Sequence, residues 1–150
     1  MKAPKIVFLE TAAKEKRTLL CRVVEHFFES GNKVQIVVDT TMAAQNIDQL
    51  LWTFSQASFV PHKMVSPPLS QTIIEPVAIT VGEIPLQGFD TLVIDEWVNL
   101  ETIKNYALAV HFVLMDDSEQ RLQSRMLWQS AKEQGFQLQH LPAAANLKGL

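Results

Sequence analysis

The acidic pair Asp95 and Glu96 directly follows the apolar run 92–94, and this is the pattern in the chain closest to a catalytic motif. An apolar strand ending in Asp-Glu is typical of nucleotide hydrolases, in which the aspartate helps to hold magnesium and the glutamate positions water. Such enzymes also need a glycine-rich loop, whose backbone N–H groups hold the phosphates. The segment after the first expected strand, ETAAKEKRT at 10–18, has no glycine. The pattern therefore favours acidic residues at a strand end, and a degenerate nucleotide-binding protein is the alternative.

The other reactive side chains predict neither a metal site nor covalent catalysis. The four histidines, His26, His62, His111 and His140, have no HxxxH spacing, and the single cysteine, Cys21, lies in an apolar helical run. A structural zinc site normally needs four ligands at short spacings, and no serine lies in a GxSxG motif. We therefore expect no metal, no cofactor and no catalytic residue. His62 could titrate, but a histidine after a proline is more often a turn or packing residue.

The last expected helix carries cations around a tryptophan. Arg121, Arg125, Trp128 and Lys132 are spaced i, i+4, i+7 and i+11, which places them within a ~60° sector of one helix face. Such a face suits a short acidic peptide with an aromatic end, because the cations attract carboxylates and the ring offers apolar area. The alternative is a solvated basic face with Trp128 half-packed against the core, and spacing alone favours that alternative.

A second group of aromatic residues lies near the end of another expected helix. Trp52 precedes the run Phe59-Val60-Pro61-His62 in a stretch too apolar for a solvated loop. The stretch contains no nucleophile, metal or phosphate motif. Clustered aromatic rings form either part of the core or a small interface with a partner protein.

Composition limits the classes of protein. The chain has 150 residues and a net charge of -3 at pH 7, which fits one domain. The weak acidity counts against a domain that binds nucleic acid directly through the last helix, because such domains are usually basic. One cysteine excludes an internal disulfide and suits a reducing compartment. The N-terminal apolar run is a strand rather than a signal peptide, and we expect a cytoplasmic protein without a membrane span.

The order of apolar segments predicts an α/β fold. Strands are expected at 5–9, 34–38, 77–81, 91–94 and 111–115, with a short edge strand at 136–138; helices are expected at 12–30, from the capping residues 39–41 to 54, at 100–109 and at 118–134. Strand-helix alternation at both ends indicates a single three-layer domain with a mostly parallel sheet. This domain should span 1–140, and 141–150 should be a loose tail.

Several of these segments together resemble the chi subunit family of bacterial DNA polymerase III. The most specific similarity is Leu51-Trp52 followed by Ser-Phe-Val-Pro-His at 58–62. Further similarities are the first strand, the helix end Ser-Gly-Asn-Lys at 30–33, the junction FVLMDDS at 112–118 and the closing helix with Gly-Phe at 135–136. The resemblance extends to about residue 138.

The resemblance implies a nucleotide-binding-like fold without a phosphate loop and a non-catalytic accessory subunit of the polymerase complex. In the family this subunit joins the psi subunit, and through psi the clamp loader. It also binds the acidic C-terminal tail of single-stranded DNA-binding protein, which ends in Pro-Phe. Contact with DNA would be only indirect, and no membrane is involved.

The resemblance also implies two groups of site residues. The tail site falls on Val113, Arg125, Trp128 and Lys132, with Leu114 as the alternative to Val113. The psi-like partner, or a helicase-like alternative partner, would bind Trp52, Phe59, Val60 and Pro61. The family usually has tyrosine at the position of Trp128 and arginine at that of Lys132. Lysine keeps the charge but lacks the bidentate fork of arginine, which puts the affinity in doubt.

Overall fold

A seven-stranded parallel sheet forms the centre of the computed structural model, which describes residues 4–54, 59–65, 73–142, 147 and 150. The strands are β1 (Lys5–Thr11), β2 (Val34–Val38), β3 (His62–Val65), β4 (Val77–Val81), β5 (Thr91–Ile94), β6 (Leu108–Leu114) and β7 (Gln137–Leu141). Their order in the sheet is β3-β4-β2-β5-β6-β1-β7, and every pair is parallel. β2 and β5 are buried throughout, as their mostly apolar sequences predict for a sheet covered on both faces, and each contains one buried polar residue, Gln35 or Thr91.

Helices lie between the strands, and two of them begin at residues whose side chains cap the helix. The helices are α1 (Lys16–Glu29), preceded by a short 3-10 helix (Ala13–Glu15), α2 (Thr41–Thr53), α3 (Leu100–Ile103) and α4 (Ser118–Glu133). The side chains of Thr40 and Asp117 accept hydrogen bonds from backbone N–H groups in the first turns of α2 and α4. Gly135 has a positive φ of 85° just after α4, where a residue without Cβ can end the helix.

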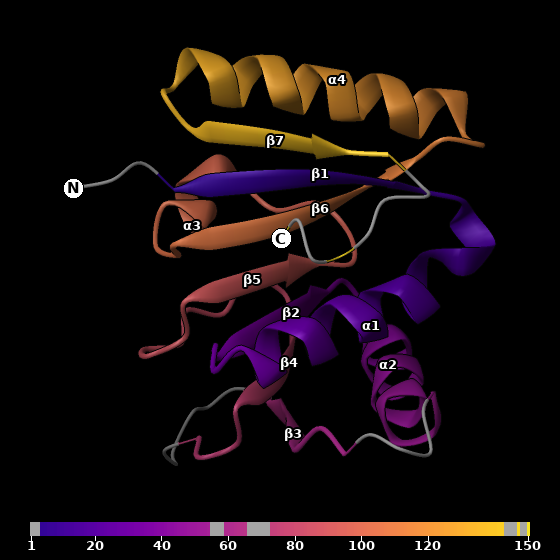
Figure 1. Ribbon diagram of the computed structural model, residues 1–150, viewed down its shortest axis with the longest axis vertical. Coiled ribbons are helices and arrows are strands. Elements are labelled where there is room, and N and C mark those ends of the chain that lie inside the picture. Colours follow the sequence, from indigo (N-terminus) through magenta and orange to yellow (C-terminus); the bar gives the residue numbers. More distant parts are fainter. Residues whose placement is uncertain (1–3, 55–58, 66–72, 143–146, 148–149) are drawn as a thin grey trace.

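The helices cover both faces of the sheet, so the domain has three layers (Figure 1). On one face, α1 and α2 pack apolar side chains such as Leu20, Phe27 and Ile47 against the sheet. On the other face, α3 and α4 pack Ile103 and Ala131 against residues such as Ile6 and Phe8. The expected three-layer α/β class is confirmed, and the sheet is more uniformly parallel than the expected "mostly parallel" arrangement.

The middle of the chain differs from the sequence-based expectation. The helix expected at 100–109 is a single turn, and β6 begins at Leu108. The backbone N–H groups of Ala107 and Leu108 donate to the carbonyl oxygen of Asp90, which draws this segment into the sheet. β6 lies between β5 and β1, so the strand gains hydrogen bonds on both sides that outweigh local helix propensity.

The two edge strands differ from the sequence-based prediction: β3 is not predicted, and β7 is longer than predicted. β3 was not expected, because its sequence is only four residues long and follows a proline; it forms by pairing with β4. β7 runs to Leu141, because it pairs in register with β1 along its whole length. The expected loose tail falls largely outside the described residues, while Leu147 and Leu150 pack partly buried against the core.

Candidate functional site

A groove of about 560 Å³ lies between α4 and the C-terminal halves of β1, β6 and β7. It is lined by Phe8 and Glu10 of β1, Val113 of β6 and the following Met115, Arg121, Ser124, Arg125, Trp128 and Gln129 of α4, and His140 of β7. α4 runs alongside β7, with α1 and α2 at a distance (Figure 1). The groove therefore has a strand floor and a single helical wall.

The inner face of α4 determines which side chains reach this groove. Ser124 and Ala131 are buried against the sheet, and Trp128, half-buried, meets the edge of the Phe8 ring at a centroid distance of 5.0 Å. Trp128 is thus both packed on the core and part of the groove wall. A half-packed Trp128 and a peptide-binding face on this helix are therefore compatible. Arg125 is exposed beside it.

A buried histidine fixes α4 to the sheet beside the groove. Nε2 of His111 in β6 lies 2.8 Å from Oγ of Ser124 in a hydrogen bond. The His111 ring also contacts Phe8 and Trp97. Burial, with a smaller contribution from the charge of Lys16, lowers the pKa of His111 from its usual 6.5 to about 4. The imidazole is therefore neutral at physiological pH, as a buried helix anchor requires.

The groove combines apolar surface with free cations. Phe8, Val113, Met115 and Trp128 supply the apolar part. In the part of the chain that the structure describes, neither Arg121 nor Arg125 forms an ion pair, so both guanidinium groups can pair with a ligand. A ligand with an apolar end and carboxylates matches these groups.

The structure brings together three of the four residues expected for tail binding. Val113, Arg125 and Trp128 line the groove, whereas Lys132 is exposed on α4 and does not line it. Val113 rather than Leu114 faces α4, because successive side chains of a strand point to opposite faces. Arg121, one helical turn before Arg125, lines the groove in addition.

The floor residues could not be found from the sequence. Glu10 and His140 lie on different strands and 130 positions apart, yet their side chains are in hydrogen-bond contact. No spacing rule relates residues so distant, because their contact depends on β7 returning to pair with β1. The sheet register is the only signal that would have indicated them.

The expected partner residues form an aromatic surface at the opposite edge of the sheet. Trp52 and Phe59 are 52% and 65% exposed, with ring centroids 5.6 Å apart, so neither ring is a core residue. Val60 is buried in the core, and Pro61 is partly buried. These two residues anchor the segment that presents Phe59.

The buried side chain of His62 packs against this surface, as expected for a packing residue. Its ring lies 4.7 Å from the Trp52 ring, and Nδ1 lies 2.7 Å from the carbonyl oxygen of Val60. Nε2 lies 3.1 Å from Oδ1 of Asp48, an ion-pair contact when the ring is protonated. These contacts hold the tryptophan and the Val60 backbone in fixed relative positions.

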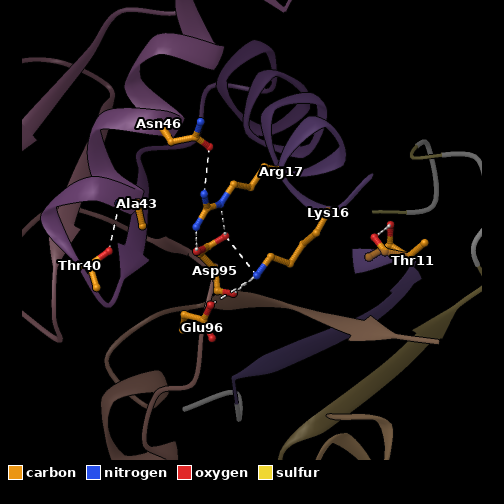
Figure 2. A network of polar contacts seen from close by, with 9 residues as sticks. Thr11, Lys16, Arg17, Thr40, Ala43, Asn46, Asp95 and Glu96 are labelled. Carbon is orange, nitrogen blue, oxygen red and sulfur yellow. Dashed lines mark hydrogen bonds and ion pairs between the residues drawn. The ribbon is translucent and has the colours of Figure 1, made fainter. Parts of the chain in front are cut away.

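Asp95 is engaged by cations of the chain itself (Figure 2). Nη2 of Arg17 lies 3.2 Å from Oδ2, and Nζ of Lys16 lies 3.4 Å from Oδ1 and donates to the Asp95 carbonyl oxygen at 2.7 Å. Lys16 also lies 3.6 Å from Glu96, and Arg17 donates to Asn46 of α2. The carboxylate is fully buried, so this network joins β5 to both α1 and α2.

We expect no magnesium-dependent hydrolysis of ATP, because Lys16 and Arg17 occupy the Asp95 carboxylate. The Asp95→Asn variant should have a lower melting temperature than the wild type, because the two cations lose their shared carboxylate. It should release phosphate from ATP no differently from the wild type. Thermal unfolding and a phosphate-release assay check both points; wild-type turnover that disappears in Asp95→Asn would contradict the expectation.

Among the described residues, no three His, Cys, Asp or Glu side chains cluster in a way that could hold a metal ion. No helix in the same part of the chain is long and apolar enough to cross a membrane.

Fold and groove together define a nucleotide-binding-like α/β domain that carries an apolar and cationic groove. Known structures agree with this class. The crystal structure of T4 UvsW superimposes with a TM-score of 0.67 at 9% identity, covering 94% of this chain and 42% of that chain. S. cerevisiae Dbp5 L327V bound to RNA and ADP BeF3 gives 0.67 at 14% identity, covering 96% and 43%. This chain thus spans less than half of either, and the similarity concerns the fold.

The chain belongs to the DNA polymerase III chi subunit family. The family model described as "DNA polymerase III chi subunit, HolC" matches residues 3–139. A search of curated proteins gave no match. Family membership identifies an accessory subunit of DNA polymerase III that takes part in DNA replication.

Proposed function

We propose that this chain is a non-catalytic adaptor of the replication machinery. It would link the clamp loader, through a psi-like subunit, to the acidic C-terminal tail of single-stranded DNA-binding protein. The observation that carries the proposal is the groove that places Arg125 and Trp128 beside Val113. This combination suits a short acidic peptide with an aromatic end.

The groove chemistry assigns a role to each side chain. The terminal phenylalanine of the tail would lie against Trp128 and Val113, where burial of its ring supplies most of the free energy of binding. The terminal carboxylate would pair with Arg125, whose planar guanidinium can donate two parallel hydrogen bonds. Arg121 is placed to receive an acidic side chain further along the tail. Lys132, outside the groove, would add only long-range attraction.

The aromatic surface of Trp52 and Phe59, anchored by Val60 and Pro61, is the proposed site for the psi-like subunit or a helicase-like alternative partner. Its exposed rings offer apolar area of the kind that dominates protein interfaces. It lies toward the β3 edge of the sheet, whereas the groove lies toward the β7 edge. The two partners could therefore bind at the same time.

Titration of the purified chain with an acidic peptide ending in Pro-Phe tests the tail site. We expect saturable binding that weakens when salt is raised, because salt screens the exposed cations. The same peptide with an amidated C-terminus should bind less tightly, because it lacks the carboxylate that pairs with Arg125. Mononucleotides and a single-stranded oligonucleotide serve as controls. Tight binding of the oligonucleotide without binding of the peptide would contradict the proposal.

The Phe59→Ala variant should lose affinity for a psi-like subunit while binding the acidic peptide like the wild type. Its melting temperature should change little, because the Phe59 ring is 65% exposed and contributes little to the core. Co-purification with the subunit, peptide titration and thermal unfolding measure the three effects. If the melting temperature falls strongly, or if both ligands lose affinity together, Phe59 is structural and the surface is misassigned.

A further inference from the structure

A carboxylate lies on the floor of the groove, opposite the arginines. Glu10 in β1 is the neighbour of Val113 in the register of the sheet, and its side chain is 20% exposed. His140 in β7 lies beside it, with Nε2 2.6 Å from Oε2 of Glu10. Both residues line the groove together with Arg121 and Arg125. The site is therefore not a simple cationic pocket.

Without the contact with His140, the negative charge of Glu10 would repel an acidic ligand in the groove. Carboxylates held close together repel each other, and the repulsion is strongest where the surrounding protein excludes water. His140 counters this in either protonation state, because an Nε2–H group can donate to the Glu10 oxygen. A protonated ring also balances the negative charge.

We propose that His140 is a specificity-determining residue of the groove, because it covers the Glu10 carboxylate and so allows an acidic peptide to enter. This inference rests on the proposed function. His140 acts through Glu10, because it holds the carboxylate in the 2.6 Å contact with Nε2. Peptides without acidic side chains and without a terminal carboxylate do not meet this repulsion, so their binding does not depend on His140.

A double-mutant cycle with two peptides tests the inference. The variants are His140→Ala, Glu10→Gln and the double variant; the peptides are the acidic free acid and a matched amidated peptide with amides in place of its acidic side chains. Because coupled neighbouring residues commonly change affinity by about fivefold or more, we expect His140→Ala to weaken the acidic peptide by about that factor. Glu10→Gln should bind it at least as tightly as the wild type, and the double variant should follow Glu10→Gln.

A conservative variant and the neutral peptide separate specificity from packing. His140→Gln keeps an N–H donor near Glu10 and should retain more affinity than His140→Ala. The neutral peptide should bind the wild type and all variants with the same affinity within about twofold. Because the His140 side chain is 50% exposed, melting temperatures should stay close to that of the wild type.

The outcomes distinguish this inference from the proposed function. If the wild type binds the acidic peptide but His140→Ala binds it equally well, the role of His140 is overturned and the tail site stands. If His140→Ala weakens both peptides to the same extent, His140 only shapes the groove and the inference is likewise overturned. If the wild type does not bind the acidic peptide at all, the proposed function and the inference fail together.

Discussion

Replacing Arg125 or Trp128 by alanine should weaken the binding of an acidic peptide ending in Pro-Phe by about 30-fold or more, which corresponds to ~2 kcal/mol. The Arg125→Ala variant would lack the charge-assisted hydrogen bonds to the peptide carboxylate. The Trp128→Ala variant would lack the apolar wall of the groove. Fluorescence or calorimetric titration of each variant measures the loss. Arg125→Ala should also bind with a weaker dependence on salt than the wild type, because one charge contact is removed.

Lys132 provides the matched control on the same helix. Lys132→Ala should cost clearly less affinity, because this exposed side chain lies outside the groove and contributes only screened attraction. Since Trp128 also packs on Phe8, its alanine variant must be compared with Trp128→Tyr, which keeps an aromatic ring. If Arg125→Ala and Trp128→Ala both bind like the wild type, the tail site is not on this face of α4.

The second large effect is a loss of stability at acidic pH caused by His111. Its pKa in the folded chain is lowered to about 4 from the usual 6.5, so the unfolded chain binds the extra proton between these pH values and the folded chain does not. The contribution to the free energy of unfolding is complete above pH 6.5 and is lost as the pH falls toward 4. From this shift the loss is about 3 kcal/mol at its largest.

Urea unfolding of the wild type and of a His111→Asn variant between pH 7 and pH 4 measures this contribution. The variant should be less stable at pH 7, because asparagine leaves part of the aromatic cage of His111 empty. Its free energy of unfolding should nevertheless fall less steeply with decreasing pH, and the two curves should converge. Parallel curves would show that His111 titrates alike in the folded and unfolded chain, contrary to its burial.

The sequence predicts the central strands well, because burial on both faces leaves a clear apolar signal. β2 and β5 have the expected bounds for this reason. The signal fails where pairing rather than composition decides the structure. β3 owes its strand conformation to β4, and the N-terminal end of β6 is fixed by hydrogen bonds to Asp90. Neither cause is visible in a local window of sequence.

The candidate site divides in the same way between local and distant information. Helical spacing placed Arg125 and Trp128 on one face, because that periodicity is local to α4. The resemblance to a family supplied Val113, and the strand alternation decided between Val113 and Leu114. Spacing could not place Glu10 opposite Arg125, since this requires the parallel order β6-β1-β7.

The strand order gives the two proposed binding surfaces a fixed separation. β3 and β7 are the outermost strands of the sheet, and neighbouring strands lie about 4.8 Å apart, so the sheet holds its edges roughly 29 Å apart. A hydrogen-bonded sheet is far stiffer than a flexible linker of that length. Two partners bound at its edges would be held at a narrow range of distances, which sets their effective concentration toward each other. The domain would then act as a rigid molecular spacer between its two partners. A flexible linker of the same length could not take its place, because it would not hold the partners at one distance.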